Sequence, residues 1–511
     1  MDKKVLRWNF IFQYGWVLTN LFNSILLLPL YIKHIDANTL GVWLATSSIL
    51  SWMTLVDPGI GEVLQQNIAE LRGKNMKDEI GKSIGSGYIA SSFILVIAVA
   101  VGFICYFSLG FIIDKDVSQY PHLAMALMVS VFATGLSLVS WTISGINQGL
   151  HNAADVAISS LSSNFLFLGV NILFLYLGYG VMSIAIANVF RAIYINIYNM
   201  VSMKKFLQKE NMPVVFSKLH FKKFIKIFSF TSASKIISGL SYSVDMVVLA
   251  RFIPPAMITM YEINKRPINI TNSLIGRHSV ALMPSISHAK GLDDTEAITS
   301  LINKQFKLYA YAALFTSFMF FINYKNLITL WTGADKYAGN TTVYLLIAYA
   351  FIGLICYFMS NVQYALGDIK SNSLFNIIRN LFYGVAMFFA AREYGIIGTL
   401  VVSISLALAA DFFFYAYKVH KLGYLQMALI KSTFATWSII IPGSLFVAWL
   451  LKTFVLKIVA PSAYFSQMIS CSIAFSAFFI VLLLMVDGDM RNELKIFKKN
   501  FTLNLLYKRG I

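Results

Sequence analysis

The feature that most constrains this chain is a series of about fourteen apolar runs, each long enough to cross a lipid bilayer. A helix of about 20 apolar residues spans the hydrocarbon core and satisfies its own backbone hydrogen bonds there. The runs cover residues 12–32, 41–66, 84–112, 123–146, 158–177, 181–201, 228–250, 259–285, 306–331, 341–366, 373–391, 397–417, 433–451 and 465–486. We therefore predict an all-α polytopic membrane protein with about 14 transmembrane helices.

The composition excludes a soluble alternative. Of the 511 residues, 58% are hydrophobic and 13% are charged, whereas a soluble chain is about 25% charged. Cys105, Cys356 and Cys471 lie far apart within apolar runs, so we expect neither a disulfide framework nor a metal site. The basic start of the chain leads into an apolar run without a small-residue cleavage site, and we interpret that run as an uncleaved first span.

Membrane orientation explains most of the net charge of +18. With both chain ends in the cytoplasm, the inner segments carry 26 lysines and arginines, and the outer segments carry 7. Basic residues concentrate in cytoplasmic loops, so a missed or extra helix would invert the bias in every later loop. The charge pattern therefore favours an even number of spans with cytoplasmic N and C termini, and it indicates no nucleic acid partner.

The longest cytoplasmic loop divides the first twelve spans into two halves of six. It holds seven lysines, which we interpret as a topology signal combined with contact to anionic membrane lipids. A parallel repeat of the two halves would align residues 30–43 loosely with residues 249–262. The predicted parts are residues 1–201 (spans one to six), 202–227 (basic inter-half loop), 228–417 (spans seven to twelve), 418–486 (spans thirteen and fourteen) and 487–511 (basic cytoplasmic tail).

Polar side chains recur on one face of the eighth span. At about 100° per residue, one arc of this helix holds Glu262, Lys265, Arg266, Asn269 and Arg277, and isoleucines occupy much of the rest. A helix that only faced lipid would be apolar all round, so this face is expected to meet other helices or water.

Other spans also carry polar positions. Serine and asparagine stripes on spans one, four, five and six are most often helix–helix hydrogen bonds in membrane bundles. Ionised groups are different, because a charge at the bilayer centre costs at least about 2.5 to 3.5 kcal/mol unless water, a counter-ion or a ligand compensates. The further embedded positions are Arg191 in span six, Lys235, Tyr242 and Asp245 in span seven, Arg379 in span eleven, and Asp57 at a break near the inner end of span two.

The embedded cations predict a mildly cationic cavity where spans six, seven, eight and eleven converge. Such a cavity suits an anion, and phosphate is a natural partner for arginine and lysine donors. Tyr242 is a candidate to stack on a sugar ring, although amphipathic aromatic residues in membrane proteins are more often interface anchors. The predicted substrate-binding residues are Lys235, Lys265, Arg266, Arg277, Arg191, Arg379, Asn269 and Tyr242.

Several segments, taken in their order along the chain, resemble a known family. They are TLGVWLATSSILSWMTLVDPGIGEVLQQNIAEL, the SGINQGL turn after span four, Pro284-Ser285-Ile286-Ser287 at the end of span eight, and LITLWTGADKY before span ten. Over essentially the whole chain, the sequence is similar to the Wzx-type O-antigen and oligosaccharide flippases of the multidrug/oligosaccharidyl-lipid/polysaccharide exporter superfamily.

The resemblance implies a fold and a function. The fold would be two six-helix lobes in a V around a central cavity, with two extra C-terminal helices. The function would be alternating-access transport of an undecaprenyl-diphosphate-linked oligosaccharide, an O-antigen or capsular repeat unit, to the outer leaflet of the bacterial inner membrane. Asp57, Asp245 and Glu262 would couple transport to H⁺ or Na⁺, and an O-antigen polymerase and glycosyltransferases would be pathway partners. Span one departs from the family pattern, because it has Asn20 and Asn23 but no interior arginine.

Two other functions remain as alternatives. A multidrug and toxin extrusion exporter would share the fold, but its cavity should be acidic and aromatic. A membrane glycosyltransferase or polymerase would need a sizeable outer loop with Arg, His or Asp, and the longest outer loop, residues 452–464, has no acid and no His. The sequence contains no GxGxxG, P-loop or HExxH motif, so we expect neither enzymatic activity nor a cofactor.

Overall fold

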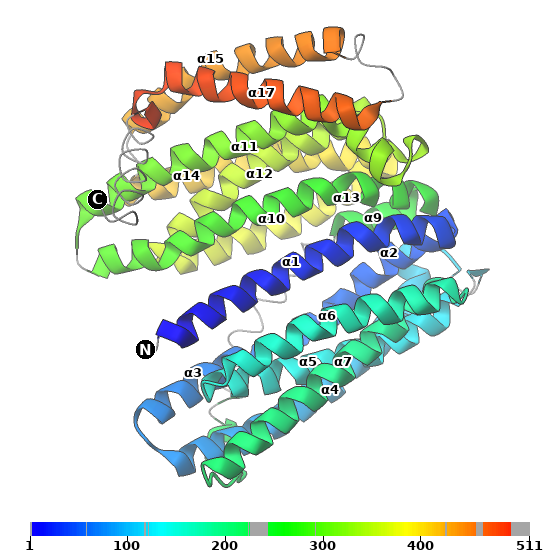
Figure 1. Cartoon of the computed structure of the whole chain (residues 1–511), viewed down its shortest axis with the longest axis vertical. Coiled ribbons are helices and arrows are strands. Elements are labelled where there is room, and N and C mark those ends of the chain that lie inside the picture. Colours follow the sequence, from blue (N-terminus) through cyan, green and yellow to red (C-terminus); the bar gives the residue numbers. More distant parts are fainter. Residues whose placement is uncertain are drawn as a thin grey trace, which may run out of the picture. The chain divides into compact units, whose positions relative to one another are not determined.

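A computed structural model describes residues 3–57, 59–116, 119–120, 122–222, 224, 244–291, 293–424, 427–455 and 463–491. Throughout these residues the regular structure is helical, without a strand (Figure 1), which confirms the predicted all-α class. The elements are α1 (Lys3–His34), α2 (Ala37–Ser51), η1 (Trp52–Val56), α3 (Ile60–Gly73), α4 (Lys77–Ile113), α5 (Leu123–Gly149), α6 (Ala153–Tyr176), α7 (Met182–Lys209), α9 (Val244–Phe252), α10 (Pro255–Gly291), α11 (Thr295–Thr332), η3 (Ala334–Lys336), α12 (Asn340–Ala365), α13 (Ile369–Leu406), η4 (Ala407–Phe412), α14 (Phe413–Lys421), α15 (Met427–Leu450), η5 (Leu451–Val455) and α17 (Tyr464–Val486).

The helices agree with the predicted spans. Among the described residues, 10 helical stretches are long and apolar enough to cross a membrane. One of them, Ser371–Lys421, holds two predicted spans. Helices α1 and α10 match the first and eighth spans, and of the predicted seventh span, 228–250, only the part in α9 lies within the described residues. The chain is therefore a multi-pass membrane protein.

The long stretch from α13 to α14 reverses direction at Gly395. This glycine has non-helical backbone angles, φ 56° and ψ −135°. A Cβ atom on Gly398 would lie 2.3 Å from the carbonyl oxygen of Ala390, whereas residues eight apart in a straight helix are separated by about 12 Å along the axis. The chain therefore turns back on itself here, as the separate eleventh and twelfth spans require.

The second span is interrupted as its sequence predicts. The helical path passes from α2 through η1 and stops at Asp57, and α3 begins after Gly59, whose φ is 90°. The buried Asp57 carboxylate accepts hydrogen bonds from the N–H groups of Gly59 (3.0 Å) and Ile60 (3.1 Å). These donors would otherwise be unpaired at the start of α3, so Asp57 stabilises the break.

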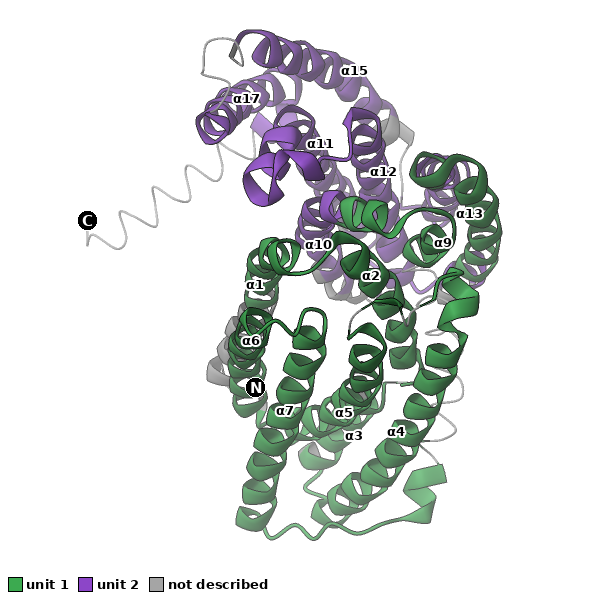
Figure 2. Ribbon diagram, turned by 90° about the vertical axis from the view of Figure 1, so that its right-hand side faces the viewer, with its two compact units in different colours: residues 1–262, 376–399 green, residues 263–375, 400–511 purple. Residues whose placement is uncertain are grey.

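The packing of the helices divides the chain into two compact units (Figure 2). Unit 1 comprises Met1–Glu262 and Asn376–Thr399, and unit 2 comprises Ile263–Phe375 and Leu400–Ile511. The predicted boundaries of the two six-span halves remain a prediction.

Inside unit 1, polar side chains join α5, α6 and α7. The fully buried Asn199 of α7 donates to the Ser144 hydroxyl at 3.0 Å and accepts from the Ser159 hydroxyl at 3.0 Å. The backbone carbonyl oxygen of Asn199 accepts a hydrogen bond from the side-chain amide of the buried Asn147 at 2.8 Å. For these residues, the prediction that serine and asparagine stripes form helix–helix hydrogen bonds is confirmed.

Inside unit 2, α17 is fixed to α11 near the predicted inner surface. Asp487, which follows α17, accepts a hydrogen bond from the Tyr311 hydroxyl. Lys307 lies 2.6 Å from the Asp489 carboxylate and 3.7 Å from that of Asp487. Phe475 and Phe479 pack against Phe315 and Phe318 in the same interface. The last span is therefore joined to the unit by both polar and apolar contacts.

The two halves repeat one particular helix-end contact. Arg72 of α3 donates to the carbonyl oxygen of Leu150, which follows α5. Lys290 of α10 donates to the carbonyl oxygen of Leu366, which follows α12. The cations are 218 positions apart and the leucines 216 positions apart, and each cation meets the negative end of a helix dipole.

The residues that follow these leucines also correspond. Ser202 of α7 bonds with Asn152 and Asp155, and Lys418 of α14 contacts Asp368 at 3.5 Å and Ser371 at 2.9 Å. Ser202 and Lys418 are likewise 216 positions apart. The residues that they contact are separated by the same distance in sequence: Asp368 follows Asn152 by 216 positions, and Ser371 follows Asp155 by 216 positions. These matched contacts support a parallel internal repeat of the two halves.

Candidate functional site

The candidate site consists of the embedded charged residues that the sequence singles out. Of the predicted substrate-binding residues, Lys235 and Tyr242 lie outside the described residues.

The polar face of α10 is oriented by an anchor on its opposite side. The fully buried Asn264 donates to the carbonyl oxygen of Lys336 at 2.7 Å and accepts from the N–H of Ala338 at 3.3 Å. The Tyr324 hydroxyl donates to the carbonyl oxygen of Asn264. Ile268 is buried on the same side. This face of α10 is therefore fixed against the rest of unit 2.

Two of the predicted cationic residues of α10, Arg266 and Arg277, lie on the side of the helix away from that anchor. At about 100° per residue, Asn269, Arg266 and Arg277 lie roughly 140° to 220° around the helix from Asn264. Arg266 and Asn269 are partly buried, and Arg277 is exposed. Lys265, about 100° from Asn264, is also partly buried. The structure thus brings Arg266, Asn269 and Arg277 onto one face of α10.

The two predicted arginines of unit 1 lie against aromatic rings. Arg191 of α7 is partly buried, with its guanidinium carbon 5.8 Å from the centroid of the Phe167 ring in α6. Arg379 of α13 lies 4.7 Å from the centroid of the Tyr383 ring and donates to the Asn380 side chain at 3.2 Å. Contact with a ring face stabilises a guanidinium in a weakly hydrated environment.

The buried carboxylate of Asp245, a predicted ion-coupling residue, contacts the residue that precedes Glu262 in the chain. Asp245 of α9 is 8% exposed and accepts a hydrogen bond of 3.0 Å from the Tyr261 hydroxyl of α10. Glu262 follows Tyr261 in the chain and is partly buried. The third predicted coupling residue, Asp57, caps α3 as described above. Within unit 1, the structure thus brings Asp245 into contact with Tyr261, the residue before Glu262.

Reasoning from the sequence missed one embedded titratable residue. His278 of α10 is partly buried, and its Nε2 lies 2.8 Å from the Gln305 side chain of α11. Its ring lies 6.5 Å from that of Tyr309, centroid to centroid. The signals that could have found it are its place directly after Arg277 and the polar Gln305 immediately before the ninth span.

Solved structures share this fold. A lipid II flippase MurJ in an inward closed conformation superposes with a TM-score of 0.67 at 16% sequence identity, covering 94% of this chain and 99% of that one. An inward-facing multidrug resistance MATE family transporter of the MOP superfamily gives 0.61 at 14% identity, covering 80% and 95%. A MOP superfamily transporter from Pyrococcus furiosus gives 0.54 at 13% identity, covering 82% and 96%.

The fold is therefore that of the polytopic flippases and transporters represented by MurJ and the MATE proteins. Comparison with curated protein sequences finds no match. A family model described as polysaccharide biosynthesis protein matches residues 40–290. This match covers 251 of the 511 residues and, together with the shared fold, confirms the resemblance inferred from the sequence.

Proposed function

We propose that the protein is a flippase that moves an undecaprenyl-diphosphate-linked oligosaccharide from the cytoplasmic to the outer leaflet of the bacterial inner membrane. The cargo would be an O-antigen or capsular repeat unit. The family description, polysaccharide biosynthesis, supports this class of cargo. The observation that carries the proposal is the shared face of Arg266, Asn269 and Arg277, opposite the buried anchor at Asn264.

That face has the chemistry that a diphosphate requires. Guanidinium groups donate paired hydrogen bonds to phosphate oxygens, and the asparagine amide adds a neutral donor. Lys235, Lys265, Arg191, Arg379 and Tyr242 would complete the headgroup site, with the tyrosine beside the sugars. The lipid tail would stay in the bilayer while the polar headgroup crosses by alternating access, so no covalent step is required.

The energy for directional transport would come from an ion bound at the embedded acids. Asp245 with its Tyr261 donor, Glu262 and Asp57 are the candidates for H⁺ or Na⁺ coupling. Binding of either cation would reduce the negative charge of these acids, so the affinity for an anionic headgroup would change with their occupancy. The polymerase and glycosyltransferases of the same pathway would consume and supply the cargo.

Charge removal on α10 tests the proposal. In a strain that lacks the protein, we expect Arg266→Gln, Arg277→Gln and their double variant to give less surface glycan and more lipid-linked repeat units than the unmodified chain. Arg392→Gln is the matched control, because Arg392 is an exposed arginine whose predicted place is an outer loop. Membrane abundance of each variant is measured by immunoblotting, which separates loss of transport from loss of protein.

Two results would contradict this function. Normal surface glycan in the α10 double variant would exclude these cations from headgroup binding. Normal glycan in the strain without the protein, combined with greater sensitivity to cationic drugs, would favour a multidrug exporter instead. The buried Asp245 carboxylate gives that second function its physical basis, since an embedded acid suits a cationic cargo.

A further inference from the structure

The segment between α7 and the predicted seventh span lies on one face of α4. We call residues 211–222 the strap. Met212 near its start and Phe224 just after its end are buried in the apolar core of unit 1. At its start, Lys77 of α4 bonds with the Glu210 side chain at 3.1 Å, which holds the pKa of that carboxyl below its ordinary value. The strap is thus held at both ends.

Two glycines of α4 let the strap backbone approach closely. A Cβ on Gly81 would lie 1.8 Å from the carbonyl oxygen of Pro213, and one on Gly85 would lie 2.5 Å from that of Val215. The N–H of Val215 also donates to the carbonyl oxygen of Gly81 at 3.3 Å. Any larger residue at either glycine would collide with the strap backbone.

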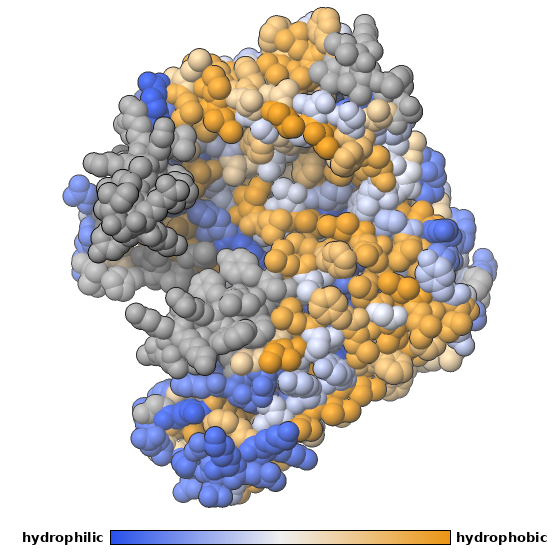
Figure 3. All heavy atoms as spheres, in the orientation of Figure 1, coloured by the Kyte–Doolittle hydropathy of each residue, from blue (hydrophilic) through white to orange (hydrophobic). Residues whose placement is uncertain are grey.

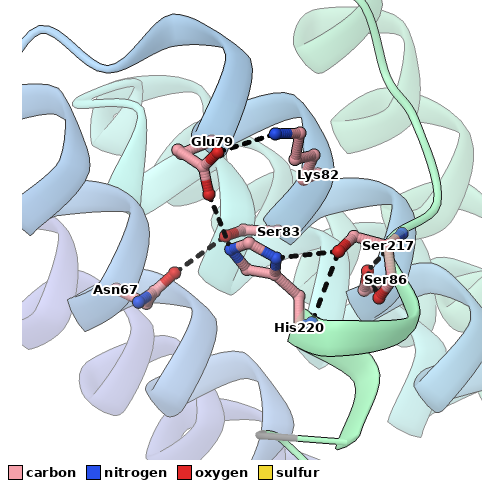
Figure 4. A network of polar contacts seen from close by, with 7 residues as sticks. All are labelled: Asn67, Glu79, Lys82, Ser83, Ser86, Ser217 and His220. Atoms are coloured by element: carbon pink, nitrogen blue, oxygen red, sulfur yellow. Dashed lines mark hydrogen bonds and ion pairs between the residues drawn. The ribbon is translucent and has the colours of Figure 1, made fainter.

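Polar contacts fix the rest of the strap (Figure 4). The Ser86 hydroxyl donates to the carbonyl oxygen of Ser217 at 3.0 Å and accepts from its N–H at 3.1 Å. His220 lies 3.1 Å from the Glu79 carboxylate, which also pairs with Lys82 at 2.7 Å, and its Nδ1 is 3.1 Å from the Ser217 hydroxyl. The strap therefore has a defined inner side, and its other side is available to a partner.

The outer side of the strap combines exposed apolar residues with lysines. Val215, Phe216 and Leu219 are 52%, 48% and 78% exposed. Lys218 and Lys222 are exposed among them. Exposure of apolar side chains to water is unfavourable. Apolar residues interleaved with lysines are typical of segments that lie at the interface of an anionic membrane.

The position of the strap on α4 indicates the same partner. Ile89, Phe93 and Val96 of α4 are exposed large apolar residues, as expected of a lipid-facing stripe. At about 100° per residue, these three lie within roughly 140° of the helix circumference together with Gly81 and Gly85. The strap therefore covers the inner end of the face that meets lipid. Figure 3 shows hydrophilic side chains gathered at this end of unit 1 and hydrophobic ones beyond it.

We propose that the strap is a docking site for anionic phospholipid headgroups of the inner leaflet, with Val215, Phe216 and Leu219 inserted at the interface and Lys218 and Lys222 on the headgroup phosphates. This surface is independent of the cargo proposed above. It rests on the loop charge bias that assigns this end of α4 to the cytoplasmic side.

A fluorescent probe on the strap tests the proposal. The full chain, with Cys105, Cys356 and Cys471 changed to alanine, carries Leu219→Cys labelled with an environment-sensitive NBD group. It is reconstituted into phosphatidylcholine vesicles with or without phosphatidylglycerol. We expect phosphatidylglycerol to shift the emission to the blue, to protect the probe from iodide and to expose it to quenching by spin-labelled lipids.

Two pairs of variants sharpen the result. Lys218→Gln with Lys222→Gln should lower the ratio of membrane-embedded to water-exposed probe by about fivefold for each lysine removed. Lys204→Gln with Lys205→Gln, on α7 before the strap, should leave this ratio unchanged. Gly81→Ala should release the strap and abolish lipid contact, whereas Gly169→Ala, where a Cβ meets nothing within 4 Å, should not. Equal iodide access with and without phosphatidylglycerol, or an unchanged signal in the Lys218/Lys222 variant, would overturn the proposal.

Discussion

At the scale of single residues, asparagine has two different roles in this protein. Asn199 and Asn147 are fully buried and hydrogen-bonded between helices, whereas Asn269 is partly buried on the face of α10 opposite Asn264. Because the residue type is the same, the role of each asparagine depends on whether its side of the helix packs against other helices. A residue that is bonded to neighbouring helices holds the bundle together, and we propose that one on the face opposite the anchor contacts the cargo.

Removal of the Asn199 side chain should weaken the packing of α5, α6 and α7. Asn199→Ala leaves Ser144 and Ser159 without this partner, and we expect the free energy of unfolding in detergent to fall by about 1 to 2 kcal/mol. Ser92→Ala is the control, because the Ser92 hydroxyl bonds only with Tyr88 of its own helix in the contacts described here. Equal stability of the two variants would argue against a helix-joining role for Asn199.

At the scale of elements, breaks in helices are as informative as the helices. The second span stops at Asp57, whose carboxylate caps α3, and the stretch from α13 to α14 turns at Gly395. Both breaks rest on a residue type that the backbone requires: a short acidic cap in one case and a glycine in the other. The corresponding turn in the first half lies at Gly180, where Ser183 bonds back to the Gly180 carbonyl as Thr399 does to that of Ile396.

The turn at Gly395 should not tolerate a side chain. Its φ of 56° with ψ of −135° is a conformation that L-residues with a Cβ rarely adopt, so Gly395→Ala should lower the free energy of unfolding by about 1 to 3 kcal/mol. Gly384→Ala in the same helix is the control, since a Cβ there meets nothing within 4 Å. The comparison is made by thermal unfolding of the purified proteins, and a stable Gly395→Ala protein would contradict the turn.

At the scale of the whole molecule, the topology can be tested directly. In the cysteine-free background, we expect Tyr179→Cys and Glu393→Cys to react with a membrane-impermeant maleimide in intact cells. Met76→Cys should react only after the membrane is permeabilised, because the charge bias places its turn in the cytoplasm. All three positions are exposed, so a lack of labelling would not result from burial. The reverse pattern would invert the proposed orientation of the chain.

Much of this fold could be predicted from the sequence, because lipid imposes helix length and loop charge directly on the residues. The single stripe of α10 and the break at Asp57 followed from helical periodicity and turn chemistry. The strap could not be predicted, since Gly81 and Gly85 differ from other small helical residues only through a segment that contacts them more than a hundred positions later. The contact of His278 with Gln305 was missed because it depends on how α10 packs against α11, which the periodicity of a single span does not show.

The strap also has a consequence for the order in which the protein is made. Its described contacts, at Lys77, Glu79, Gly81, Gly85 and Ser86, all precede it in the chain. The core that buries Met212 and Phe224 likewise consists of earlier residues. When residues 211–224 leave the ribosome, their docking surface is already synthesised, so the strap can close on the first six spans before the seventh is complete. A chain that ends shortly after Phe224 and has been released from the ribosome should already protect the strap from protease.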